Sequence, residues 1–218
     1  ELSLLVAQAV KAGDLGAKPG QLVSLYRAPQ ANTPRLVLVG IGEGKAKHVR
    51  AAVMSALGAV KASLGKKLVL AFAAAAQEDA VRAAVLAVAD ATYSYTHAKS
   101  KPEPRTLQKC LVAASNAAEV SASFARATAT IVGMELAKEW ANRPANHATP
   151  TLLGQAAQAL AKLPKVSCEV LGPKEVAKLG MGSFMAVAQG SDEPLRFIVL
   201  RYDGAAKTKA PTVLVGKG

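Results

Sequence analysis

The first half of the chain alternates short apolar segments with longer amphipathic ones, and this alternation constrains the fold more than any other feature of the sequence. Strand-like runs rich in Val and Leu occupy residues 22–26, 35–39, 67–73 and 107–114. Apolar residues at helical spacing occupy residues 1–13, 45–60 and 77–98, and Gly13 is the predicted stop of the first of these helices. Strands that alternate with helices of this length indicate βαβ units, so we predict an α/β fold with a mainly parallel sheet.

A long segment without proline separates the two halves of the chain. In residues 118–141 the apolar positions follow spacings of four and three, which predicts a helix with one buried stripe. The predicted stripe consists of Val120, Phe124, Ala127, Ile131 and Met134. Pro144 ends the pattern, because proline cannot continue a helix. We therefore expect three parts, namely residues 1–117, a linking helix over residues 118–142, and residues 143–218.

The third part opens with a helix start signal, Thr149 as the capping residue and Pro150 at the first helical position. Strands are predicted over residues 166–171, 196–201 and 212–215, and a short helix over residues 173–179. Residues 184–189 are ambiguous between the two patterns. The third part is therefore also expected to be α/β.

The composition limits the class of protein. Hydrophobic residues make up 51% of the 218 residues, which excludes a disordered chain. No uncharged apolar run approaches the roughly 18 residues of a membrane span, so we expect no membrane partner. Cys110 and Cys168 form neither a disulfide framework nor a zinc-ribbon spacing. Free thiols favour a reducing cytoplasm, and Cys110, within a predicted strand, is typical of a small buried apolar group.

The net charge is +12, from 27 basic and 15 acidic side chains. Two local clusters stand out, Lys45/Lys47/Arg50 and Lys99/Lys101/Arg105/Lys109. No aromatic residues interleave with them, so we interpret the charge as a basic, solvated surface rather than a nucleic-acid site. A net charge of this size would still attract polyanions in a salt-dependent way.

Two glycine segments occupy positions where sites form in α/β proteins. Residues 40–45 (GIGEGK) follow a predicted strand and precede a predicted helix, as a phosphate-binding loop does. Lys45 replaces the third glycine of the dinucleotide fingerprint and Glu43 would repel phosphate, so we interpret the segment as a tight turn. Residues 216–218 (GKG) follow the last predicted strand and lack the Walker A pattern. A lysine between two glycines at the carboxyl end of a strand is nevertheless unusual. In open α/β sheets, binding and catalytic sites gather at that edge.

The histidines offer no further site. His48, His97 and His147 are far apart in sequence and form no HExxH motif.

Three segments of the second half are distinctive: LAKEWANRPANHATP at residues 136–150, LGMGSFMAVAQGSDEPLRFIVLRYDG at residues 179–204 and PTVLVGKG at residues 211–218. They resemble, in the same order, segments of the leucyl aminopeptidase (cytosol aminopeptidase) family. The turn at residues 18–21 and the segments 38–42 and 93–101 look like the N-terminal domain of that family. The resemblance therefore covers nearly the whole chain.

The resemblance implies a macro-domain-like N-terminal α/β domain over residues 1–117, without its first strand. The long helix would join it to the truncated beginning of an α/β catalytic domain over residues 143–218. It also implies a hydrolase, a metalloprotease that releases N-terminal amino acids, notably leucine, from peptides with two divalent ions, zinc or manganese. A cytoplasmic homohexamer is the assembly that the family implies.

One site residue carries over from the family. The lysine of its Val-Gly-Lys-Gly motif ligates one metal ion through the amine, and that lysine is Lys217 here, between Gly216 and Gly218. An amine ligates only when neutral, so a nearby dication must lower the lysine pKa from about 10.4. The other ligands and the catalytic residues of the family lie beyond residue 218. We therefore expect no catalytic residue within this chain and no cofactor-binding residue apart from the metal ligand.

A binding role is the alternative. The same basic protein would bind DNA or act as a regulator, independently of catalysis.

Overall fold

The computed structural model describes residues 2–29 and 31–217, and in it the chain forms a mixed α/β structure. Glu1, expected in the first helix, and Gly218, expected beside Lys217, lie outside the described residues. The chain divides into two compact units, Glu1–Ala141 and Asn142–Gly218. Among the helices in the described part of the chain, none combines the length and the apolar character that a membrane crossing requires.

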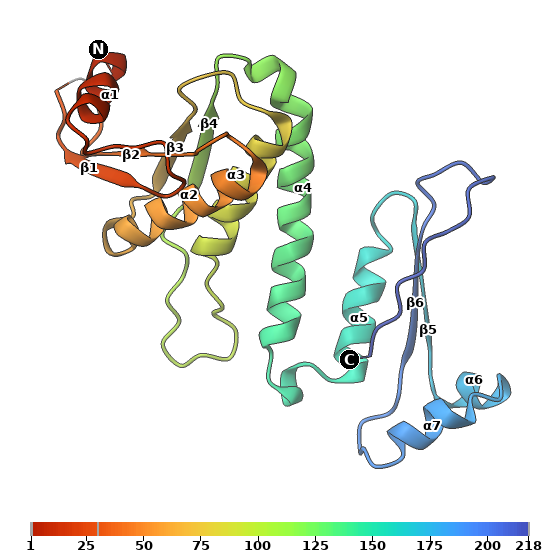
Figure 1. The fold of residues 1–218 in the computed structure, drawn as a ribbon. Helices are drawn as coiled ribbons and strands as arrows, with labels where there is room; N and C mark the ends of the chain where they lie inside the picture. Colours follow the sequence, from red (N-terminus) through yellow and green to blue (C-terminus); the bar gives the residue numbers. More distant parts are fainter. Residues whose placement is uncertain (1, 30, 218) are drawn as a thin grey trace. The chain divides into compact units, whose positions relative to one another are not determined.

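The elements of the first unit follow the predicted order (Figure 1). They are α1 (Leu2–Lys11), β1 (Leu22–Tyr26), β2 (Arg35–Val39), α2 (Ala46–Val60), the 3-10 turn η1 (Lys61–Ser63), β3 (Lys67–Ala71), α3 (Glu78–Thr92), β4 (Lys109–Ala113) and α4 (Ala117–Asn142). Gly13 follows α1 with φ of 82°, a left-handed conformation that stops a helix at no steric cost for glycine. Its predicted role as the end of the first helix is confirmed.

The strands pair differently from the prediction. β3 and β4 are parallel, with Leu68 opposite Cys110, and α3 makes the crossover between them. β1 and β2 are antiparallel, because residues 27–34 are too short a connection for a crossover. β5 (Val166–Leu171) and β6 (Phe197–Tyr202) are also antiparallel, since Leu171 stands opposite Phe197 and the chain returns at the same end. The expectation of a mainly parallel sheet is therefore wrong for the described residues, whose strands form separate two-stranded sheets.

Helix α3 lies between α2 and α4 (Figure 1), and about half of its residues are buried. Its buried residues are Ala80, Val81, Ala84, Val85, Ala87, Val88 and Ala89. Ala84 and Val88 pack in a cluster with Val49 of α2. Val81 packs in a second cluster with Ala127 of α4. Because alanine adds only a methyl group, the neighbouring helices approach α3 closely, and the alanine-rich composition serves this packing.

The β3–β4 pair is covered on one face. Leu68 and Cys110 pack against the cluster between α2 and α3, and burial raises the pKa of the Cys110 thiol, as expected for an inert buried cysteine. On the other face Val69 is 52% exposed and Leu111 is 37% exposed. The alternation of burial along both strands shows that these apolar runs are half-buried, not buried on both faces.

Helix α3 ends at Thr92, six residues before the predicted end at Ala98. Arg105, from the following loop, donates through Nε to the carbonyl oxygen of Thr92 at 3.0 Å. Its Nη2 also pairs with Glu135 of α4. The arginine thus satisfies a carbonyl that the next helical turn would otherwise have used, and Tyr93 takes an extended conformation.

Helix α4 buries the predicted stripe except at one position, and Ile131 packs against the same cluster as Val120 and Ala127. Val120 and Ala127 are buried as expected, but Phe124 is 37% exposed and Ser123 is buried in its place. The hydroxyl of Ser123 donates to the carbonyl oxygen of Glu78 at 2.8 Å, at the start of α3. The short side chain lets α4 lie close to that helix. The proposed boundary between residues 1–117 and a separate linking helix stays a prediction.

The second unit contains η2 (Ala145–His147), α5 (Pro150–Leu160), β5, α6 (Pro173–Lys178), α7 (Gly182–Ala188) and β6. Thr149 caps α5 as predicted, its hydroxyl accepting from the backbone N–H of Leu152 at 3.3 Å. Residues 184–189, which the sequence left ambiguous, belong largely to α7. Helix α5 packs against β5, and Val176 of α6 is fully buried.

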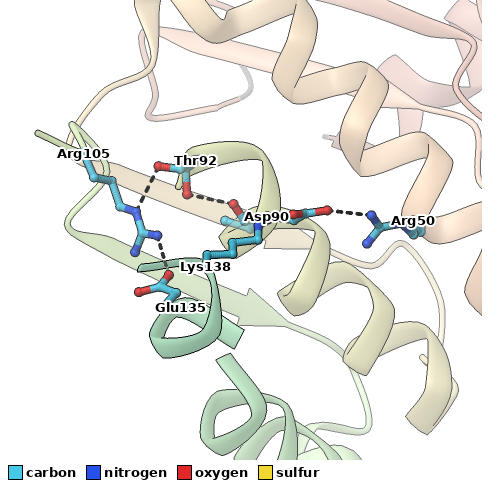
Figure 2. A network of polar contacts seen from close by, with 7 residues as sticks. Arg50, Asp90, Thr92, Arg105, Glu135 and Lys138 are labelled. Carbon is cyan, nitrogen blue, oxygen red and sulfur yellow. Dashed lines mark hydrogen bonds and ion pairs between the residues drawn. The ribbon is translucent and has the colours of Figure 1, made fainter. Parts of the chain in front are cut away.

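A charged contact at Asp90 ties α2, α3 and α4 together (Figure 2). The carboxylate accepts from Arg50 of α2 at 2.6 Å and from Lys138 of α4. These two hydrogen bonds, led by that from Lys138, hold the pKa of Asp90 below its ordinary value. The side chains of Asp90 and Lys138 are 27% and 30% exposed, so solvent screens this contact less than it screens a surface ion pair.

We expect Asp90→Asn to lower the free energy of unfolding by about 1–2 kcal/mol, because Arg50 and Lys138 would lose a shared carboxylate. Urea denaturation at neutral pH measures the loss. Since the pKa of Asp90 is lowered in the folded state, its contribution is present above the ordinary aspartate value of about 3.9 and is lost as the pH falls below it. The difference between wild type and variant should therefore shrink in acid.

The matched control for this prediction is Glu43→Gln. Glu43 pairs with Lys45, and the two side chains are 67% and 62% exposed, so solvent leaves this pair little stabilising effect. Equal losses of stability in the two variants would contradict the role given to Asp90.

Candidate functional site

The predicted metal ligand, Lys217, lies in a segment without regular structure. Residues 212–215 were expected to form a strand. They pair with none of the described strands, so the structure contradicts this expectation. Val213 is 73% exposed, and Leu214 and Val215 are each 93% exposed. Lys217 is exposed as well.

The described residues do not assemble a metal site around this lysine. Among residues 2–29 and 31–217, no group of three or more His, Cys, Asp or Glu side chains is arranged to hold an ion. Gly218, the second flanking glycine, is outside the described part of the chain. A single exposed amine does not by itself make a dinuclear centre. The role of Lys217 stays a prediction.

The glycine loop at residues 40–45 is a tight turn packed on the segment before β1. Gly42 and Gly44 have φ of 55° and 69°, which glycine adopts without strain. The N–H groups of both glycines already donate to protein carbonyl oxygens, those of Ala17 at 2.8 Å and Ile41 at 3.0 Å. These amides are therefore not available to a phosphate, which agrees with the predicted tight turn.

Gly40 is the position in this turn where space is most restricted. A Cβ atom there would lie 2.7 Å from the carbonyl oxygen of Lys18 and would also collide with that of Gly16. Gly40 in turn exchanges backbone hydrogen bonds with Gly20 and Gln21. Because Gly40 has no side chain, the end of β2 can pack directly against the backbone of the preceding turn.

Three charges of the two basic clusters are already paired within the protein. Lys45 pairs with Glu43, Arg50 with Asp90 and Arg105 with Glu135. This pairing lowers the charge that the clusters present to a polyanion. DNA binding stays a prediction.

A shallow groove in the second unit brings together polar groups that the sequence analysis did not single out. It has a volume of about 390 Å³ and is lined by Thr151, Gly154, Gln155, Gln158, Val170, Gly172 and Arg196. We call it the Arg196 groove. Helix α5 supplies one wall, and β5 with the residue that precedes β6 supplies the other. Nothing in the spacing of these residues predicts the groove, because they come from segments brought together only by the fold.

Helix α6 is capped beside this groove by its own glutamate. Glu175 accepts from the backbone N–H of Gly172 through Oε2 at 3.0 Å. Backbone N–H groups of Glu175 itself and of Gly172 lower the pKa of this carboxyl. The carboxylate is thereby committed to the start of α6.

Comparison with known families gives two matches that together span most of the chain. The model of the cytosol aminopeptidase family, N-terminal domain, matches residues 1–102. The model of the cytosol aminopeptidase family, catalytic domain, matches residues 135–218. The second match begins within α4 and continues through the whole second unit.

Curated relatives match over the entire chain. A probable cytosol aminopeptidase of Albidiferax ferrireducens is 60% identical over 217 residues, which cover 100% of this chain and 45% of that protein. A probable cytosol aminopeptidase of Methylibium petroleiphilum is 44% identical over 220 residues, covering 100% of this chain and 46% of that protein. The chain therefore spans just under half the length of the curated relatives it matches.

A solved structure shares the fold. The bottromycin maturation enzyme BotP in complex with Mn superposes with a TM-score of 0.70 and 28% identity. The alignment covers 90% of this chain and 42% of that one.

We expect Gly40→Ala to lower the free energy of unfolding by about 2 kcal/mol or more, because the new methyl group would meet backbone oxygens that cannot rotate away. Gly58→Ala is the matched control. A Cβ at Gly58, within α2, would meet nothing within 4 Å, so the better helix propensity of alanine should raise stability by about 1 kcal/mol. Chemical denaturation of both variants measures the two effects. A neutral Gly40→Ala would show that the turn does not need close backbone contact.

Proposed function

The chain belongs to the cytosol aminopeptidase family, and from this premise we propose that the whole protein is a metal-dependent aminopeptidase that releases N-terminal residues from peptides. The observation that carries the proposal is that one chain matches both the N-terminal and the catalytic domain of the family. In addition, the whole length of this chain is 60% identical to part of a probable cytosol aminopeptidase. The activity is proposed for the whole protein, because the chain spans 45% of that relative.

Leucine is the N-terminal residue that we propose the enzyme prefers. We further propose that the first unit is macro-domain-like and that the whole protein works as a cytoplasmic homohexamer. The support for these features is the resemblance of both halves of the chain to this family.

Two divalent ions, zinc or manganese, are the proposed cofactors. The solved structure of BotP is of a complex with Mn, which supports manganese as one choice. Within this chain Lys217 is the proposed metal ligand, through a neutral amine. The described residues supply no carboxylate cluster beside it, so the remaining ligands would come from elsewhere in the whole protein.

We expect the full-length protein to hydrolyse leucine p-nitroanilide and to lose this activity when a chelator removes its metal ions. Adding manganese or zinc back should restore it. Activity that survives complete removal of metal, with metal content checked by mass spectrometry, would reject the metal-dependent mechanism. Equal rates on leucine, alanine and glutamate p-nitroanilides would reject the leucine preference alone.

We expect Lys217→Ala to lower kcat/KM by about 100-fold or more and to reduce the metal bound per subunit, because a ligand is lost from the centre. The measurements are turnover and metal content of the purified full-length variant. Lys207→Ala is the matched control, since Lys207 is exposed in the same segment and has no proposed role. Metal content and turnover like those of the wild type in Lys217→Ala would contradict the assignment.

A further inference from the structure

The Arg196 groove is shaped by glycine. Along α5, Thr151, Gln155 and Gln158 line the groove at spacings of four and three, which place them on one helix face. Gly154 is buried within this face, and a Cβ there would lie 3.1 Å from a methyl carbon of Val170. The missing side chain lets α5 approach β5, so the polar side chains stand at the rim of the shallow, partly apolar Arg196 groove.

Arg196 brings a cation to this depression without an acidic partner. The residue is half-buried, and its Nη1 donates to the carbonyl oxygen of Leu195 at 2.9 Å. That bond uses one of five guanidinium N–H groups. Within the described residues no carboxylate forms an ion pair with Arg196. A half-buried guanidinium in this state favours an external anion, because charge-assisted hydrogen bonds are the strongest it can form.

Glu175 is the acidic group that restricts which anion fits. A Cβ on Gly172 would lie 3.1 Å from Oε2 of Glu175 and 3.8 Å from Nη1 of Arg196, so both groups flank this glycine without forming an ion pair. The carboxylate is already held by the backbone of Gly172. Its negative charge opposes a dianion, such as phosphate near neutral pH, more strongly than it opposes a monoanion.

We propose that the Arg196 groove binds a small monocarboxylate. The guanidinium matches the planar carboxylate with two parallel N–H donors. The side-chain amides of Gln155 and Gln158 are neutral donors that add no further charge. Val170 and the two glycines offer an apolar wall to an aliphatic body, and the volume of about 390 Å³ is that of a small-molecule site.

A free amino acid is the ligand that we infer. This choice rests on the proposed function, because an aminopeptidase releases free amino acids, and those with an uncharged side chain carry a single carboxylate. An Asp or Glu side chain from elsewhere in the whole protein is the other source of the same chemistry. The two sources of the carboxylate can be distinguished. An Asp or Glu side chain of the protein would occupy the groove before any ligand is added, whereas a free amino acid would occupy it only after addition.

Hydrogen exchange followed by mass spectrometry tests the proposal on the full-length protein. Its probes are L-leucine, 4-methylpentanoate, which lacks the amine, and L-leucinamide, which lacks the carboxylate. We expect the first two to slow exchange in peptides covering residues 150–158 and 168–176, and leucinamide to leave it unchanged. Equal effects of all three probes, or none, would overturn the proposal. An internal carboxylate on Arg196 would already fill the groove, so 4-methylpentanoate would neither bind nor slow exchange there, and this outcome also overturns the proposal.

Substitutions test whether binding of the carboxylate depends on Arg196. Arg196→Gln should raise the Kd for 4-methylpentanoate by about 10- to 100-fold, because the charged hydrogen bonds are lost. Arg196→Lys keeps the charge without the planar fork and should give an intermediate Kd, and it carries the test where the glutamine variant does not fold. Arg201→Gln is the control, because Arg201 is an exposed arginine of β6, the strand that Arg196 immediately precedes. An unchanged Kd in Arg196→Gln overturns the proposal, whereas hydrolysis of leucine p-nitroanilide reports separately on the proposed function.

Discussion

The packing of α3 between two helices is the constraint on which the first unit depends. Its buried face carries alanine and valine, so α2 and α4 both come close, and β3 and β4 pack beneath through Leu68 and Cys110. Small side chains remove little apolar surface each, at about 25 cal/mol for every Å² buried. The stabilisation of such a core therefore comes from many short contacts rather than from a few large anchors.

This kind of core explains where the charged contacts lie. The apolar contacts of α4 with α3 run from Val120 to Ile131, and beyond them Glu135 and Lys138 face other parts of the same unit. Arg105 and Asp90 meet these two side chains and continue the attachment of the helix by ion pairing (Figure 2). Ion pairs here are directional and specify one rotation of α4, which a stripe of alanine methyl groups would define only loosely.

Elements whose signals are local were predictable from the sequence. Thr149 with Pro150 located the start of α5, and Gly13 located the end of α1, because capping depends on a few neighbouring residues. The end of α3 was missed because it depends on Arg105, thirteen positions after Thr92. The stripe of α4 was wrong at one position, Phe124, because the hydroxyl of Ser123 donates to the carbonyl oxygen of Glu78 and the serine is buried instead, which no periodicity could reveal. The Arg196 groove was missed for the same reason, and the family motif that indicated Lys217 carries information that periodicity and charge do not.

The exposed apolar run at residues 213–215 has a consequence for how this polypeptide behaves at high concentration. Unpaired strand-forming residues invite association between copies through backbone pairing. The net charge of +12 opposes this by mutual repulsion. Added salt shortens the Debye length to about 3 Å at 1 M and removes that repulsion without weakening the apolar attraction. For this 218-residue chain taken by itself, we therefore expect association to increase with ionic strength.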